Sequence, residues 1–394
     1  MTVAAFMELA LYDSRFGYYA RAPRRSGRAG DFFTSVDVGA FFGRLLALQI
    51  AEMAHIVTTI SAETAERADH SIGPPQRPFA DRTSTDSSDG ALSGPVFDLV
   101  EAGAGDGRLS ADILGALRAH APAVYERARL HLVEASPSAR DAQADVLGDA
   151  AGRLASSSAE LPPSYEGVLF ANELLDACPV HQVIMRSDGL HEVYVDERAG
   201  TLVTREGPLS TPALAEYLAR LHIALEPGWR VEISLAAVAW VREASRRLRR
   251  GFMILLDYGH PARELYSVTH ASGTLTSFSR HTMAGPETHA SHTPWLAHPG
   301  EQDITAHVDF TSIQEAAEAE GMTTLGLLDQ TYFLMGLCGA DLADSVNLVS
   351  LNDRLALKTL LMPGGLGSTI KVLILGKGVG TPTLRGCSYS TRIT

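Results

Sequence analysis

Three closely spaced glycines follow an acidic residue in the segment FDLVEAGAGDGRL. Glu101 ends an apolar run, and Gly103, Gly105 and Gly107 then lead into a helical pattern. Glycines at such a turn let the chain bend sharply and let a ligand approach main-chain N–H groups closely. Dinucleotide-binding turns have the spacing GxGxxG, but here Arg108 stands where the last glycine is expected. The segment therefore predicts a cofactor site of a kind that does not have to hold a phosphate.

A second acid follows the next predicted strand. Glu134 ends the run LVE, thirty-one residues after Gly103. A carboxylate at this place can accept two hydrogen bonds from a ribose diol, as acids do in Rossmann-like folds. A purely structural turn with a surface glutamate is the alternative. The turn, the acid and the strand–helix–strand context together favour a cofactor with a ribose.

Further acids follow a third apolar strand, Gly167–Ala171, and could contact a substrate. Glu173 and Asp176 come directly after it, where active sites of parallel sheets lie. Carboxylates there could orient a cationic group of a substrate. Asp176 could equally satisfy backbone donors at the start of a helix. We predict catalytic roles for both acids.

Two acids lie inside or at the end of other apolar strands. Glu232 is part of RVEISL, and a buried glutamate needs a partner or belongs to a site. We include Glu232 among the predicted catalytic residues and leave a salt-bridged role open. Asp257 ends FMILLD, where Tyr258 and Gly259 turn the chain, and a structural turn is the favoured interpretation.

Seven of the fourteen histidines lie between His260 and His307, which raises the question of a metal. His289 and His292 even have HxxH spacing. They fall in a predicted loop, and no cysteine or carboxylate recurs at zinc-ligand spacing. We therefore expect no metal site.

Strands alternate with helices after residue 95, which predicts an α/β fold with a mostly parallel sheet covered by helices on both faces. Apolar spacing predicts helices near 6–10 and 41–50, and one from about Ala236 to the basic residues before Gly251. Predicted strands are Val96–Glu101, Leu130–Glu134, Gly167–Ala171, His191–Val195, Arg230–Ser234, Phe252–Asp257 and Lys371–Leu375.

The domain organisation follows from changes of composition. Residues 1–60 form a predicted helical segment with a lid loop, and 61–94, rich in Ser, Thr, Asp, Pro and Gly, a flexible insertion. Residues 95–376 form the main domain, with substrate-side insertions at about 176–230 and 260–320, and 377–394 a C-terminal tail.

The composition excludes several classes of protein. With 33 basic and 46 acidic side chains the formal charge is −13, which argues against a nucleic-acid partner. The three cysteines are widely separated and form no disulfide framework, which favours a reducing compartment. No apolar run approaches the roughly 18 residues that span a bilayer, and no secretory signal is recognisable, so we expect no membrane span. The sequence gives no indication of the oligomeric state.

Several strings together resemble the MidA-like family of class I S-adenosylmethionine-dependent methyltransferases. The resemblance extends over nearly the whole chain outside the 61–94 insertion and the tail, and the matching strings are FMELALYDSRFGYY, GDFFTS, FFGRLLA, EAGAGDGRLSADIL, HLVEASP, ANELLDACPVH, LLDYGH, GTL and DITAHVDF. The chain departs from the family at Val36-Asp37, where Pro-Glu is usual, and at Ala104, which replaces a proline. Neither change removes a required glycine, although Asp37 has a shorter reach than Glu.

The resemblance implies a Rossmann-like methyltransferase fold and S-adenosyl-L-methionine as cofactor. It also implies that the aromatic loop Gly30–Ser35 folds over the cofactor, although a helix-capping role for Asp31 or Ser35 is the alternative. The expected cofactor-binding residues are Glu101, Gly103, Ala104, Gly105, Glu134, Asn172, Thr34 and Ser35, and the expected catalytic residues are Glu173, Asp176 and Glu232.

The family includes a mitochondrial complex I assembly factor that methylates an arginine. The resemblance therefore implies methylation of arginine on a partner protein related to respiratory complex I. A non-catalytic assembly scaffold that retains the cofactor fold is the alternative, and the intact Glu101, Gly103, Gly105 and Glu134 favour the enzyme. The chain starts almost on the first family motif, so we expect the bacterial cytoplasm, or the mitochondrial matrix if the source is eukaryotic.

Overall fold

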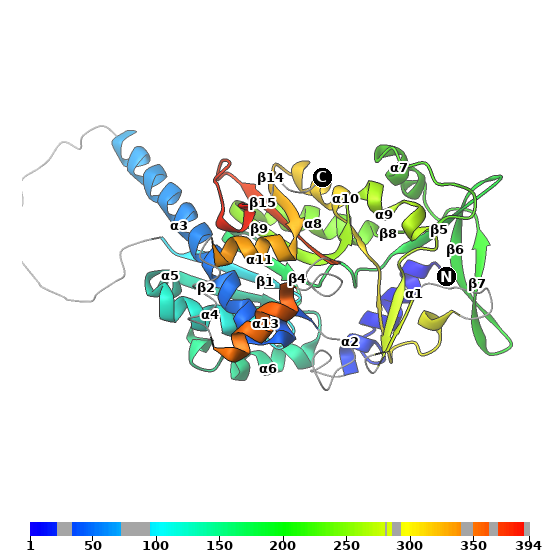
Figure 1. The fold of residues 1–394 in the computed structure, drawn as a ribbon, viewed down its shortest axis with the longest axis horizontal. Helices are drawn as coiled ribbons and strands as arrows, with labels where there is room; N and C mark the ends of the chain where they lie inside the picture. Colours follow the sequence, from blue (N-terminus) through cyan, green and yellow to red (C-terminus); the bar gives the residue numbers. More distant parts are fainter. Residues whose placement is uncertain are drawn as a thin grey trace, which may run out of the picture.

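The computed structural model describes residues 1–21, 34–71, 95–279, 282–285, 293–339, 350–361 and 369–389. An eight-stranded sheet forms the centre of the larger part of the molecule (Figure 1). Its main path is β14–β15–β9–β4–β1–β2–β3, and the short β13 pairs with β9. The strands are β1 (Phe97–Ala102), β2 (Ala128–Val133), β3 (Leu154–Ser158), β4 (Tyr165–Asn172), β9 (Leu248–His260), β13 (Val308–Asp309), β14 (Thr323–Asp329) and β15 (Ile370–Lys377).

Most of this sheet is parallel, as predicted. Strands β1, β2, β3, β4, β9 and β13 run in the same direction, whereas β15 is antiparallel to both β9 and β14. The carboxyl ends of β1, β2, β4 and β9 therefore meet at one edge of the sheet, where the glycine turn and the predicted acids follow.

Both faces of the sheet are apolar because its strands alternate buried side chains between two hydrophobic clusters. In β9, Phe252, Ile254 and Leu256 belong to one cluster, and Met253 and Leu255 to the other. The first face packs on α3 (Ala40–Ser71), α4 (Arg108–His120), α5 (Pro122–Arg127), α11 (Gln330–Cys338) and α13 (Leu351–Leu361). The second face packs on α8 (Leu235–Arg247) and α10 (Phe310–Glu318).

Helix α3 lies across the first face with Phe42, Leu46 and Ile50 fully buried. Within the described residues it contains the one segment, Ala40–Ser61, that is long and apolar enough to cross a membrane, and 61% of its most apolar window is buried in the molecule. The expectation that no run of this length and apolar character exists was therefore wrong. The segment is apolar because a core helix that packs on a sheet is apolar along much of its length.

The same helix continues to Ser71, past the predicted start of the insertion at residue 61. Ser61 donates a hydrogen bond to Glu166 Oε1 (2.9 Å) and accepts one from Arg250 Nη2 (2.8 Å), so this residue is anchored to the sheet. Residues 72–94, the rest of the predicted insertion, lie outside the described residues.

Two smaller antiparallel sheets lie beside the large one, at the right of Figure 1. The first has the order β7–β6–β5–β8, with β5 (His181–Arg186), β6 (Gly189–Arg198), β7 (Thr201–Gly207) and β8 (Arg230–Ile233). The second has the order β11–β10–β12, with β10 (Thr276–Ser279), β11 (Thr282–Ala284) and β12 (Asp303–Thr305). The strands predicted at 191–195 and 230–234 thus exist but belong to a separate sheet.

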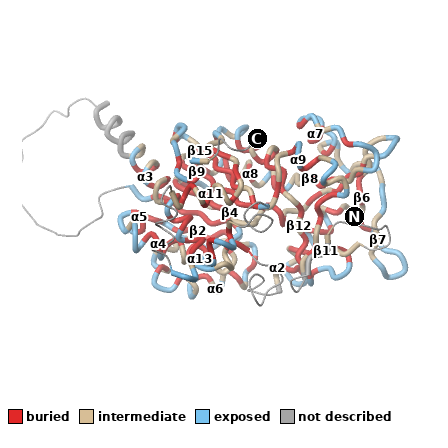
Figure 2. The backbone as a smooth tube through the Cα atoms, in the orientation of Figure 1, coloured by how far each residue is buried: buried red, intermediate tan, exposed pale blue. Residues whose placement is uncertain are grey.

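The N-terminal helix α1 (Val3–Tyr12) packs between these two sheets, and Phe6 contacts Trp295 in a buried cluster with 5.6 Å between ring centroids. Figure 2 shows buried segments in both parts of the molecule. The described residues also form α2 (Tyr18–Arg21), α6 (Pro137–Leu147), α7 (Ala213–Arg220), α9 (Ala262–Leu265), and the 3₁₀ turns η1 (Ser35–Val38), η2 (Gly148–Arg153), η3 (Val268–His270), η4 (Pro294–Leu296) and η5 (Arg385–Cys387).

One predicted boundary is corrected. The helix expected to run to the basic residues before Gly251 ends at Arg247, and Arg249 and Arg250 belong to β9. Their guanidinium groups bind Glu166 on the neighbouring strand β4 rather than the carbonyls of a helix end.

Candidate active site

The glycine turn after β1 has the conformation that its sequence demands. Gly103, Gly105 and Gly107 all have positive φ, at 71°, 53° and 84°, which is readily available only to glycine. The amides of Gly103 and Ala104 donate to the carbonyl of Val133, which fixes the turn against the end of β2. A Cβ added at Gly105 would meet no atom within 4 Å, so the space beside this residue is open to a ligand.

Glu134 lies against this turn, as the sequence predicted. Its Oε2 accepts a hydrogen bond from the Gly105 amide (2.8 Å), and its Oε1 accepts one from the Ser136 amide (2.7 Å). The side chain is partly exposed. The carboxylate thus stands beside the open space at the glycine turn, where a ribose diol could donate to its remaining lone pairs.

Glu101 takes a different place from the other expected cofactor-binding residues. Its side chain is 4% exposed and accepts a short hydrogen bond from the Ser110 hydroxyl of α4. Burial raises the pKa of Glu101 to about 8, against the opposing effect of that hydrogen bond. The contact with Ser110 fastens the start of α4 to β1 and so positions the glycine turn between them.

The segment after the predicted lid loop reaches the same edge of the sheet. Of Gly30–Ser35, residues 30–33 lie outside the described residues. The Thr34 amide and hydroxyl donate to Asp37 Oδ2 (3.0 and 2.9 Å), and Arg108 Nη2 lies 2.6 Å from Asp37 Oδ1. Asp37, the residue that departs from the family pattern, therefore joins Thr34 to the helix that follows the glycine turn.

Ser35 brings this segment to the end of β4. Its amide donates to Glu173 Oε1 at 3.4 Å, and its hydroxyl donates to Gln330 Oε1 at 3.1 Å. The contact joins two predicted site residues that are 138 positions apart in the chain.

Asn172 ends β4, and Glu173, which follows it, has an unusual backbone conformation. Glu173 has φ 54°, a left-handed conformation that is uncommon for a residue other than glycine, and its amide donates to the Leu256 carbonyl at 2.8 Å. Asn172 Nδ2 donates to Glu173 Oε1 at 3.0 Å, whereas Asn172 Oδ1 is buried without a hydrogen-bond partner. A buried amide oxygen without a partner is costly, and it fits a ligand that donates a hydrogen bond there.

Asp257 holds the turn that follows. Its Oδ2 accepts hydrogen bonds from the amides of Leu174 (3.0 Å), Leu175 (2.7 Å) and Asp176 (3.4 Å), and its Oδ1 accepts one from Tyr258 (2.8 Å). Asp257 is 1% exposed. The favoured interpretation of Asp257 as a turn residue agrees with these contacts.

No helix follows β4, so Asp176 cannot be the helix-capping acid considered above; the chain turns and enters β5. Asp176 is 8% exposed, and its pKa is raised well above its usual value, first by burial and then by the nearby Asp257 and Asp303. Its carbonyl accepts a hydrogen bond from the Ala306 amide at 2.9 Å.

Two tyrosines from the N-terminus, neither of them among the predicted site residues, complete this region. The Tyr12 hydroxyl donates to the Ala177 carbonyl at 3.0 Å, and the Tyr19 hydroxyl donates to Asp303 Oδ1 at 3.0 Å. Their rings stack with centroids 5.2 Å apart. Both belong to the string FMELALYDSRFGYY. Only the family resemblance of this string could have indicated that they lie at the site, because no pattern of reactive groups marks them.

Burial raises the pKa values of the three acids Glu173, Asp176 and Asp257. Glu173 is partly exposed yet surrounded by protein atoms, and burial, followed by repulsion from Asp176, raises its pKa to about 8. Burial also raises the pKa of Asp257 to about 7, although hydrogen bonds from backbone amides oppose the shift. No cation of the described chain is among the principal influences on Glu173, Asp176 or Asp257. A cation bound here would favour the ionised carboxylates and lower these raised pKa values.

The structure does not bring Glu232 to this group. Glu232 lies on β8 of the four-stranded sheet, and it accepts hydrogen bonds from Gln182 Nε2 (2.9 Å) and from the Thr274 amide (2.8 Å) and hydroxyl (3.1 Å). Burial raises its pKa. Three donors satisfy this buried carboxyl within the protein, and none of its contacts is with Glu173 or Asp176.

Comparisons with known proteins agree with this geometry. Residues 85–328 match the model of a family described as "Putative S-adenosyl-L-methionine-dependent methyltransferase". The mitochondrial protein arginine methyltransferase NDUFAF7 of Mus musculus is 27% identical over 367 residues, which cover 86% of this chain and 70% of the mouse protein. The corresponding protein of Danio rerio is 28% identical over 383 residues, which cover 90% of this chain and 76% of that one.

Two crystal structures of a COG1565 superfamily protein from Burkholderia thailandensis resemble the whole fold. One is described as a likely methyl transferase bound to S-adenosyl-homocysteine; it has a TM-score of 0.80 and 29% identity, and the match covers 99% of this chain and 91% of that one. The native crystal structure has a TM-score of 0.76 and 27% identity, with coverage of 99% and 90%. These matches confirm the predicted Rossmann-like class I fold.

Proposed function

This chain belongs to the family of S-adenosyl-L-methionine-dependent methyltransferases that its residues 85–328 match, and from that premise we propose that it methylates arginine on a partner protein. S-adenosyl-L-methionine supplies the methyl group when it is bound. Gly103, Ala104, Gly105 and Glu134 at the open space beside the glycine turn would hold it, together with Asn172.

The observation that carries the arginine proposal is the group of Glu173, Asp176 and Asp257, three acids at the carboxyl ends of β4 and β9 with no cation of the described chain as a principal influence. A guanidinium remains protonated at any working pH and presents several donors in a plane. It therefore suits a partly exposed carboxylate such as Glu173, and its positive charge would favour the ionised form of that carboxylate. The names of the matched animal relatives support the same substrate class.

The chemistry requires binding, orientation and removal of one proton. Methylation replaces a hydrogen on a guanidinium nitrogen, so the methylated product stays cationic and one proton leaves. We assign to Glu173 the binding and orientation of the guanidinium and the uptake of that proton, since its raised pKa suits a proton acceptor near neutrality. Asp257, whose pKa is about 7, adds negative potential in its ionised form, and it also fixes the turn that directly follows Glu173.

The identity of the partner is a proposal that rests on the family resemblance. A subunit of respiratory complex I is the first partner to test, in the mitochondrial matrix or the bacterial cytoplasm according to the source. The scaffold alternative would use the N-terminal helices to hold that partner, and it requires no methyl transfer.

Quantitative mass spectrometry of methylarginine distinguishes these functions. Proteins, including isolated complex I, would be compared in cells that carry the wild-type gene, no gene, or the Glu173→Gln variant. We expect at least one arginine to be methylated only with the wild-type gene. Loss of complex I assembly without the gene, rescued fully by Glu173→Gln with no methylarginine, would establish the scaffold instead.

A further inference from the structure

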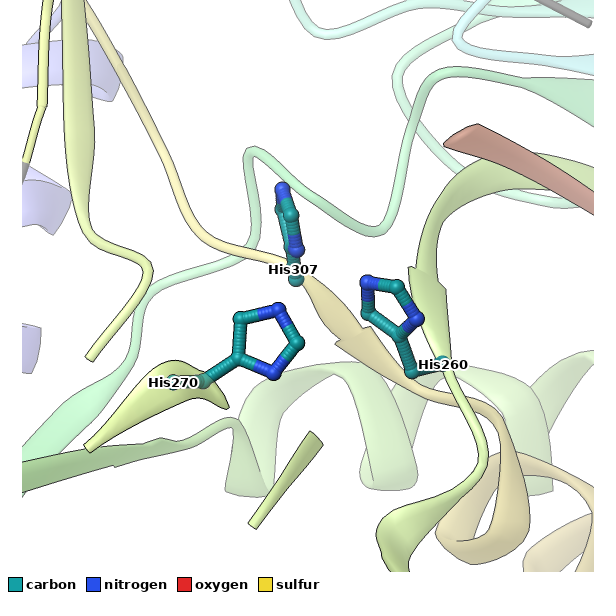
Figure 3. A group of neighbouring side chains, drawn as sticks. All are labelled: His260, His270 and His307. Carbon is teal, nitrogen blue, oxygen red and sulfur yellow. The ribbon is translucent and has the colours of Figure 1, made fainter. Parts of the chain in front are cut away.

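Three histidines from separate elements meet beside the large sheet. His260 ends β9, His270 ends η3, and His307 precedes β13. Their potential ligand atoms all lie within 4.8 Å of one another, and the three side chains are half-buried. Figure 3 shows the rings grouped around a common space, with ring nitrogens turned toward it. Ring centroids are 4.8, 5.3 and 6.0 Å apart.

The partners of the other ring nitrogens resemble those of metal-binding histidines. Nδ1 of His260 lies 2.9 Å from Glu264 Oε1, at ion-pair distance but without the alignment of a full hydrogen bond. Nδ1 of His270 lies 3.1 Å from the carbonyl of the same Glu264. Histidine ligands commonly donate their second N–H to a carboxylate or a backbone carbonyl, which orients the ring toward the metal. One residue of α9 thus orients two of the three rings and leaves their Nε2 atoms available.

The ring of His307 supplies an independent indication of a bound ligand. Nδ1 of His307 is buried and has no hydrogen-bond partner. The backbone around this ring is fixed, because the His307 amide donates to the Thr274 hydroxyl at 3.0 Å. A buried polar atom without a partner is costly unless a ligand satisfies it, and a metal ion in the common space would do so.

We propose that His260, His270 and His307 bind one divalent transition-metal ion, with Zn²⁺ as the principal candidate. Imidazole nitrogens suit Zn²⁺ and its neighbours in the first transition row, whereas Mg²⁺ requires oxygen ligands. Three histidines leave one position of a tetrahedral site for water. With bonds of about 2.0–2.1 Å the nitrogens would stand about 3.3 Å apart, so the rings must approach by up to about 1.5 Å.

The position of the site indicates its role. His260 is on β9, the strand whose Asp257 holds the turn of Glu173, whereas His270 and His307 belong to segments outside that strand. A metal ion would link these segments to the end of β9 and stabilise the folded chain, because it binds the folded state alone. The site is separate from the methyl-transfer group, and it does not depend on the proposed arginine substrate.

The test uses the full-length, untagged protein after treatment with a chelator. Titration with Zn²⁺ against a competing indicator should give one ion per chain, with a rise in melting temperature, whereas Mg²⁺ should give neither. His270→Ala should weaken Zn²⁺ binding by roughly a hundredfold or more, since even orienting residues cost about tenfold to a hundredfold. Glu264→Gln, which changes only an orienting side chain, should weaken Zn²⁺ binding by about tenfold to a hundredfold. The exposed His298, replaced by alanine, is the matched control and should bind as the wild type does.

Two results would overturn the proposal. One is the failure of the folded wild-type protein to bind Zn²⁺ at micromolar concentration. The other is unchanged binding by both His270→Ala and His307→Ala, which would place any zinc elsewhere. Circular dichroism of the chelated variants shows whether each is folded, and His270, on a short 3₁₀ turn, is the safer of the two to replace.

Discussion

The proposed role of Glu173 makes a definite prediction about the pH dependence of methyl transfer. With a pKa of about 8, only about one carboxyl in ten is ionised at pH 7 in the free protein. The arginine substrate does not titrate in this range. The rate constant kcat/KM should therefore rise by about tenfold per unit between pH 6 and 7 and level off above about 8.

Glu173→Gln should abolish this rise and lower the rate at pH 8.5 by roughly a hundredfold or more, which is the usual loss for a preorganised charged group. The assay follows transfer of labelled methyl groups from S-adenosylmethionine into protein from cells that lack the gene. Asp257 titrates nearby, with its own pKa raised to about 7, so the variant decides which carboxyl causes the rise. Full activity in Glu173→Gln, or an unchanged pH profile, would refute the assignment.

The same substitution has a consequence for stability. The pKa of Glu173 in the folded chain, about 8, lies above its usual value of 4.5. Folding therefore favours the protonated form, and the free energy of unfolding that this group contributes is present below pH 4.5 and lost as the pH rises through 8. Urea denaturation at pH 5 and pH 9 should show Glu173→Gln gaining stability relative to the wild type at the higher pH.

Other changes test the cofactor side and the turn. Gly105→Val should abolish S-adenosylmethionine binding measured by calorimetry. Gly380→Val is the control, because Gly380 has a similar φ (66°, against 53° at Gly105) and equally open surroundings. It should lower stability but leave cofactor binding intact. Glu134→Gln should weaken cofactor binding by about 1.5–3 kcal/mol, the value of a hydrogen bond to a charged group, and equal affinity would exclude the ribose contact. Asp257→Asn, studied at pH 8, should lower the free energy of unfolding by about the same amount, because the carboxylate accepts four backbone amides; an unchanged denaturation midpoint would contradict that role.

Five strands of the central sheet, β1, β2, β4, β9 and β15, were predictable because each carries a local signal, whereas β3, β13 and β14 were not predicted. Continuous apolar runs such as Phe252–Asp257 mark strands buried on both faces, and the glycine turn marks the start of α4. The separate β5–β8 sheet was not predictable as a unit. Its strands look like those of the large sheet in sequence, and only their antiparallel pairing distinguishes them.

The candidate site was predictable where residues lie next to strand ends, and not where distant segments meet. Glu134 and Glu173 follow strands directly, so their positions could be inferred from the order of the chain. Glu232 has the same local pattern, but its partners Gln182 and Thr274 come from other segments and give it a structural environment. The three histidines of the proposed metal site have no ligand spacing in sequence, whereas the HxxH pair that does, His289 and His292, lies outside the described residues.

The strand order of the large sheet has a consequence for how this protein is made. Strand β15 is the last one in the described chain, yet it lies between β9 and β14. While a ribosome is still synthesising residues 370–377, the β9 edge lacks that neighbour, and the backbone groups of Gly251–Tyr258 that pair with β15 are without their partners. An unpaired apolar edge is prone to associate with other chains. Because Asp257 and His260 both lie on β9, we expect the nascent protein to need protection by chaperones and to bind neither substrate nor metal until its last strand has been inserted.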